Sequence, residues 1–72
     1  MARLTFREAV EEIVSEMDGP AALADIAREA ARRCGRKYTE YTKRTVADAL
    51  AALPQVVRTG AGMYAPARLA LD

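Results

Sequence analysis

The apolar residues of this chain recur at helical spacing in three separate stretches. Side chains three or four positions apart lie on one face of an α-helix, whereas the residues between them face solvent. We therefore predict three amphipathic helices whose apolar faces form a common core. Their apolar positions are, in chain order, Phe6, Ala9, Val10, Ile13, Val14 and Met17; Leu23, Ile26, Ala27, Ala30 and Cys34; and Val46, Ala49, Leu50 and Leu53.

Local signals predict the ends of the first two helices. Thr5 stands three residues before Glu8, the spacing of a capping box, so the first helix should begin there. The sequence DGP at positions 18–20 should end it, because its glycine permits a positive φ and its proline cannot continue a helix. Ala22 offers no side-chain cap, so we expect the second helix to depend on tertiary contacts at its start.

The third stretch, residues 39–53, combines an apolar face with a face of short donors and cations. Either Thr39 or Thr42 can cap its start, and Pro54 stops it. Tyr41, like Tyr38 before the helix, either stacks on bases or covers an edge of the core. The polar side chains of its first turns include Thr42, Lys43, Arg44 and Thr45.

The segment after Pro54 has the pattern of a β-hairpin. Residues 55–59 and 62–66 contain β-branched and aromatic side chains, and the sequence GAG at 60–62 forms the turn between them. Because a lone hairpin is only marginally stable, we predict that residues 21–22 add a third strand.

Alternation along the hairpin makes Val57 and Tyr64 candidates for its inward face, with Val56 as a competitor. Residues 67–72 follow as a tail that either adds a helical turn or frays. The seventy-two residues are assigned to a single domain, 1–72, near the lower size limit for a core-stabilised fold.

The composition argues against an enzyme. A domain of this size has little volume for a cleft, and no residue pair has a spacing that demands catalysis. The absence of histidine and the single cysteine exclude a zinc site or a His-dependent triad within the chain. We therefore expect neither catalysis nor a cofactor.

Cys34 cannot form a disulfide within the chain, which fits a reducing compartment. Its place in an apolar stripe favours a small buried side chain over a reactive thiol. The sequence has no apolar run of the length of a membrane span or signal peptide. We expect a cytoplasmic location and no membrane partner.

The charges are unevenly distributed, although the net charge is only +1. Residues 1–18 have a balance of −3 and residues 28–44 a balance of +5. This distribution predicts an acidic side and a basic side, as in a protein that meets phosphates with one surface; the alternative is that the charges only solvate the helices. Basic residues near the end of the second helix suit its dipole as well as phosphate contact: Arg28, Arg32 and Arg33.

The order helix, short strand, helix, helix and hairpin is that of a winged helix, a mainly α fold in which a three-helix core carries a small antiparallel β-wing. The chain resembles the HARE-HTH type of winged helix-turn-helix domain. The resemblance lies in LTFREAVEEIV at 4–14, GPAALADIA at 19–27 and TVADALAALPQVVRTGAGMYA at 45–65, and it departs at Ala22, where a polar cap is usual. It implies a DNA-binding module of the kind found with restriction, chromatin and transcription proteins.

We therefore predict a small transcription regulator or accessory factor that binds double-stranded DNA. Residues 39–53 would lie in the major groove as the recognition helix, with the wing beside it. Asp48 would accept from a cytosine amino group or would indicate that this face does not meet DNA. The candidate contact residues are Arg36, Lys37, Thr42, Lys43, Arg44, Thr45, Arg58 and Thr59.

The competing hypothesis is a protein-interaction module of a larger transcription or restriction assembly that does not bind DNA directly. The small net charge and the acidic first helix suit this function. The sequence leaves the oligomeric state undecided. A two-fold homodimer would let a monomer with low DNA affinity bind two half-sites.

Overall fold

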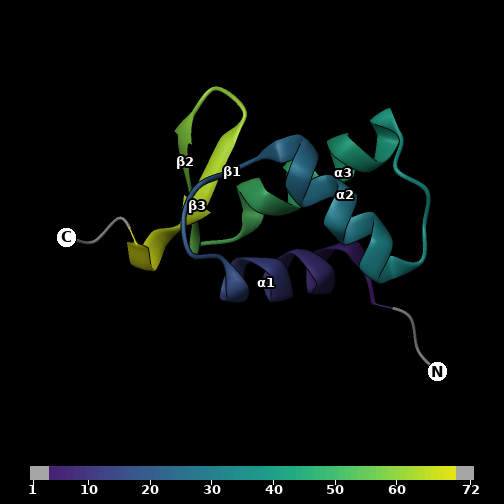
Figure 1. The fold of residues 1–72 in the computed structure, drawn as a ribbon, viewed down its shortest axis with the longest axis horizontal. Helices are drawn as coiled ribbons and strands as arrows, with labels where there is room; N and C mark the ends of the chain where they lie inside the picture. Colours follow the sequence, from purple (N-terminus) through teal and green to yellow (C-terminus); the bar gives the residue numbers. More distant parts are fainter. Residues whose placement is uncertain (1–3, 70–72) are drawn as a thin grey trace.

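Three helices and a three-stranded antiparallel sheet make up residues 4–69, which the computed structural model describes. The helices pack together, and the hairpin projects from one end of the bundle (Figure 1). This is the predicted mainly α fold, with a three-helix core and a β-wing. The elements are α1 (Phe6–Glu16), β1 (Ala21–Ala22), α2 (Leu23–Cys34), α3 (Glu40–Ala52), β2 (Val56–Gly60), β3 (Met63–Pro66) and the short 3-10 helix η1 (Ala67–Leu69).

The core forms where the apolar faces of α1, α2 and α3 meet. The alanines of α2 allow its neighbours to approach closely, and β-branched and leucine side chains from α1 and α3 fill the centre. Phe6 and Met17 were predicted as core residues but are only half-buried at its edge. The buried cluster consists of Ala9, Val10, Ile13, Val14, Ile26, Ala27, Ala30, Cys34, Val46, Leu50 and Leu53.

The start of α1 is the predicted capping box. The amide of Thr5 donates to Oε1 of Glu8 at 2.9 Å, and the amide of Glu8 donates to Oγ1 of Thr5 at 3.1 Å. The end of α1 differs from the prediction, because the helix stops at Glu16 and Met17 is already extended, with ψ of 138°. Gly19 has no positive φ, so its predicted role in ending the helix was wrong.

The carbonyl groups at the end of α1 are capped by Arg68, which lies in η1. Its guanidinium donates to the carbonyl oxygens of Val14 at 3.1 Å, Ser15 at 3.3 Å and Met17 at 2.7 Å. These bonds satisfy acceptors that a helix end otherwise leaves to water. The predicted helical turn is therefore present at Ala67–Leu69 and fixed to α1, whereas residues 70–72 of the predicted tail lie outside the described part of the chain.

The start of α2 depends on the wing, as expected from its missing cap. Ala22 makes no side-chain capping bond. The amide of Leu23 instead donates to the carbonyl oxygen of Gly62, in the hairpin turn, at 2.8 Å. At the other end Gly35 adopts the left-handed conformation, with φ of 68°, and the amide of Arg36 donates to the carbonyl oxygen of Ala31 at 2.9 Å.

The sheet has the order β1-β3-β2, so the predicted third strand is confirmed. Ala21 is paired with Tyr64, which is paired in turn with Arg58 on β2. Opposed residues of an antiparallel pair share a face, and Val57 is opposite Ala65. Val57 thus lies on the face opposite to that of Tyr64; Val56 and Tyr64 pack against the core, and the prediction for Val57 was wrong.

Candidate nucleic-acid interface

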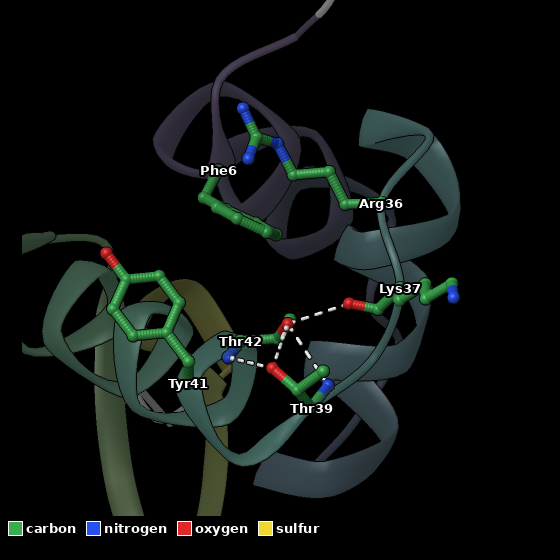
Figure 2. A pocket seen from close by; sticks show the side chains of 6 residues that line it. All are labelled: Phe6, Arg36, Lys37, Thr39, Tyr41 and Thr42. Atoms are coloured by element: carbon green, nitrogen blue, oxygen red, sulfur yellow. Dashed lines mark hydrogen bonds between the residues drawn. The ribbon is translucent and has the colours of Figure 1, made fainter.

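The start of α3 is held by a reciprocal cap between two threonines (Figure 2). Thr39 is the N-cap: its Oγ1 accepts from the amide of Thr42 at 3.2 Å, and its own amide donates to Oγ1 of Thr42 at 3.2 Å. The hydroxyl of Thr42 also donates to the carbonyl oxygen of Lys37 at 2.8 Å. Thr42 is only 3% exposed, so this predicted contact residue is a structural cap that anchors the preceding loop.

The face of α3 that points away from the core carries Arg44 and Asp48, both exposed, and Tyr41, whose surface is 76% accessible. Lys43 and Thr45 are half-buried, and at about 100° per residue they flank Arg44 on opposite sides. The hydroxyl of Thr45 donates to the carbonyl oxygen of Tyr41 at 2.9 Å, which leaves its methyl group for outside contacts.

The arginines of α2 do not contribute to a basic surface in the way the charge pattern predicted. Arg33, 19% exposed, contacts carboxylates of two helices: Glu12 at 3.2 Å, Glu16 at 2.6 Å and Glu29 at 2.7 Å. Arg28 pairs with a neighbour on its own helix, Asp25, at 3.6 Å. The arginines in the first part of the predicted basic segment, 28–44, are therefore ion-paired within the protein. Their carboxylate partners lie one turn away on α2 or on α1.

These contacts also change the acidity of the carboxylates. Hydrogen bonds from Arg32 and Arg33 lower the pKa of Glu29 to about 2. Hydrogen bonds from Arg33 lower the pKa of Glu16 as well. Both groups therefore stay ionised at neutral pH, and the acidic side of α1 and the arginines of α2 form one network between the two helices.

The basic residues after α2 differ from the arginines of α2 in their ion pairing. Within residues 4–69, no carboxylate lies within ion-pair distance of the cations that follow Gly35 and precede η1. Arg58 donates only from Nε to the carbonyl oxygen of Gly60, at 3.2 Å. This unpaired set, which we call the free cations, consists of Arg36, Lys37, Lys43, Arg44 and Arg58.

The free cations outside α3 lie beside its two ends. Arg36 and Lys37 line a hollow of about 300 Å³ with Tyr41, at the start of the helix. Arg58 lines a hollow of about 290 Å³ with Ala51, near the end of the helix. The two hollows reach α3 at Tyr41 and at Ala51, which are about 15 Å apart along the helix axis, with Arg44 between them.

The two tyrosines near α3 have different surroundings. Tyr38 lies under Arg28 of α2, whose guanidinium carbon is 5.3 Å from the ring centroid. Tyr41 projects from the first turn of α3, on the side away from Lys37 (Figure 2), and is largely exposed. Of the remaining predicted contact residues, Thr59 is exposed on β2.

Residues at the start of α1 also border this region, which no local pattern in the sequence indicates. Leu4, Thr5 and Phe6 line a second hollow, of about 460 Å³, together with Arg36 and Thr45. The apolar spacing of Phe6 suggested a core position, and nothing local indicates that it meets a loop thirty residues later. The arginine over its ring, with the guanidinium carbon 5.7 Å from the centroid, is Arg36.

Cys34 lies in the core of the three-helix bundle. Burial raises the pKa of the Cys34 thiol, which fits the predicted buried side chain rather than a nucleophile. Residues 4–69 contain no group of three or more acidic, cysteine or histidine side chains placed to hold a metal ion. In the same part of the chain, every helix is too short or too polar to cross a membrane.

Comparison of the chain with family models, with curated proteins and with solved structures gives no match.

Proposed function

We propose that this protein binds double-stranded DNA through α3 and the wing, as a small transcription regulator or accessory factor of the HARE-HTH type. The observation that carries the proposal is the division of its cations. Four arginines of α1 and α2 are ion-paired within the protein, whereas the free cations of the loop, α3 and β2 have no carboxylate partner among residues 4–69. Unpaired cations are available to replace the counterions of DNA phosphates.

The proposed binding mode places α3 in the major groove of the duplex. An α-helix with its side chains is about 10–12 Å wide and fits a major groove about 12 Å wide. Arg44, on the exposed face, can then reach guanine, and the methyl group of Thr45 can contact a thymine methyl. We assign Arg36 and Arg58, which lie beside the two ends of α3, to the phosphate backbones that border the groove.

The test is a titration with short duplex DNA over a range of salt concentrations. If about five phosphates are neutralised, a double-logarithmic plot of affinity against salt has a slope of about −4 to −5. The variant Arg44→Ala with Arg58→Ala should bind far more weakly and have a slope smaller in magnitude by about 2.

A matched control removes the same charge from ion-paired positions. Arg7 pairs with Glu11 at 3.5 Å and Arg28 with Asp25 at 3.6 Å, and both arginines are exposed. The variant Arg7→Ala with Arg28→Ala should keep more of the affinity than the α3 and wing variant. Equal losses in the two double variants would mean that only net charge matters, and the proposed interface would be wrong.

A protein-interaction module remains the second candidate, because Tyr41 is a large, exposed aromatic side chain and Asp48 places a negative charge on the same face. Absence of duplex binding at low salt would favour it. The proposal includes a cytoplasmic location, which the single buried thiol of Cys34 supports.

A further inference from the structure

A groove lies between the first turns of α1 and α3, beside the loop that joins α2 to α3 (Figure 2). It consists of two adjoining hollows, of about 300 and 460 Å³, that share Phe6, Arg36 and Tyr41. These volumes are in the lower range of sites for small organic groups. We call this region the Phe6–Tyr41 groove.

The lining of the groove combines aromatic rings with positive charge. Phe6 projects from α1 and Tyr41 from α3, on two sides of the opening (Figure 2). Arg36, one of the free cations, comes from the loop, whereas Lys37 turns its carbonyl toward the groove and its ammonium away from it (Figure 2). None of the lining residues is a carboxylate. An occupant with a flat aromatic part and a negative charge complements this surface, and a nucleotide has both.

The groove is continuous with the face of α3 that the proposed function assigns to DNA. Tyr41 and Thr45 line the groove and also lie on or beside the exposed face that carries Arg44. A strand that follows this face toward the start of α3 therefore reaches the groove. A base within a duplex is stacked and paired and cannot enter, whereas an unpaired base can enter at little cost.

We propose that the Phe6–Tyr41 groove holds one unpaired nucleotide, with its base against the ring of Tyr41 and its phosphate beside Arg36. This inference rests on the proposed function and adds a preference to it: the protein binds the junction between duplex and single-stranded DNA more tightly than uninterrupted duplex. The connection with α3 and the free cations favours DNA over an acidic peptide as the occupant.

The experiment compares fluorescence anisotropy titrations of a blunt duplex and of the same duplex with a short unpaired overhang, made in both strand polarities. Base–aromatic stacking predicts that one overhang polarity binds at least about fivefold tighter than the blunt duplex. A 2-aminopurine base in that overhang should lose fluorescence on binding, because it stacks on Tyr41.

Two tyrosine variants make the test specific. Tyr41→Ala, at a side chain that is 76% exposed, should fold and should lose both the overhang preference and the 2-aminopurine quenching. Tyr38→Ala removes the neighbouring tyrosine, which lies under Arg28 outside the groove, and should keep both.

The outcomes separate this inference from the proposed function. Equal affinity for blunt and overhanging DNA would overturn the inference and leave duplex binding in place. No binding of either DNA would overturn both. Tyr41-dependent binding of an acidic peptide containing an aromatic residue, without an overhang preference, would assign the groove to protein docking and overturn the inference.

Discussion

Arg33 on α2 contacts Glu16 on α1, with Nη2 of the guanidinium 2.6 Å from Oε1 of the carboxylate. The two residues are 17 positions apart in sequence, and the arginine side chain is 19% exposed. The contact matters beyond the packing of two helices, because it keeps carboxylates of α1 engaged with α2. The cations of the following loop, α3 and wing are left without such partners among residues 4–69.

The first prediction concerns acid stability. The pKa of Glu29 is lowered from 4.5 to about 2 by Arg32 and Arg33, and the pKa of Glu16 is lowered by Arg33. Such depressed carboxylates stabilise the fold fully above the ordinary pKa and lose this contribution as pH falls through the lowered pKa. The free energy of unfolding, measured with denaturant, should therefore decrease between pH 4.5 and about 2.

Arg33→Gln should weaken this pH dependence, because it removes the partner of Glu16 and one of the two partners of Glu29, which keeps Arg32. Arg7→Gln, at an exposed pair on α1, is the control and should leave it largely unchanged. The prediction is wrong if the free energy of unfolding falls by the same amount over this pH range in the Arg33→Gln protein and in the unsubstituted protein. The ion pairs of Arg33 would then not cause the loss of stability in acid.

The second prediction concerns the cap of α1. Arg68→Ala should lower the free energy of unfolding by about 1–3 kcal/mol, because hydrogen bonds from a charged group to the carbonyls of Val14, Ser15 and Met17 are lost. Arg58→Ala, which removes an exposed arginine from β2, should change stability little. Thermal unfolding of both variants checks the difference, and equal melting temperatures would contradict the cap.

A third prediction distinguishes two glycines. Gly35 has φ of +68°, so Gly35→Ala should destabilise the protein by about 1–2 kcal/mol. Gly19 lacks a positive φ, and a Cβ there would meet nothing within 4 Å, so Gly19→Ala should be tolerated. Denaturant unfolding measures both; a large loss in Gly19→Ala would restore the turn role that the sequence suggested for it.

The fourth prediction concerns the negative charge on α3. Asp48 is exposed and lies one helical turn from Arg44. If this face meets phosphates, Asp48→Asn should raise duplex affinity at low salt by roughly 1.5- to 5-fold, the size of an exposed charge interaction. Asp25→Asn, on α2, serves as the control for net charge. An affinity that falls in Asp48→Asn would instead indicate that Asp48 accepts a hydrogen bond from a base.

Structural features that depend on residues close together in the sequence were predictable. The capping box of Thr5 and the third strand at Ala21–Ala22 follow from local spacing and from the instability of a lone hairpin. The side-chain cap on α1 was not predictable, because Arg68 is 51 to 54 residues away from its acceptors. The face of Val57 was missed because alternation alone does not determine which side of a strand meets the core.

The candidate site was predictable only where it depends on residues that are close in the sequence. The cluster of basic residues before and within α3 is a local pattern, but its pairing state depends on which carboxylates reach it. Thr42 shows the limit most clearly: its type and position fitted both a cap and a DNA contact, and only the loop folded over it makes it a buried cap. The groove beside Phe6 required knowledge of how α1 meets the α2–α3 loop.

The hydrogen bond from the amide of Leu23 to the carbonyl oxygen of Gly62 makes the wing part of the helical framework. A partner that tightens the hairpin turn would protect the first turn of α2 against amide exchange, although α2 itself makes no contact with that partner. Conversely, a hairpin transplanted onto another scaffold would lose the support of this amide. The hairpin turn and the first turn of α2 are therefore coupled through this bond.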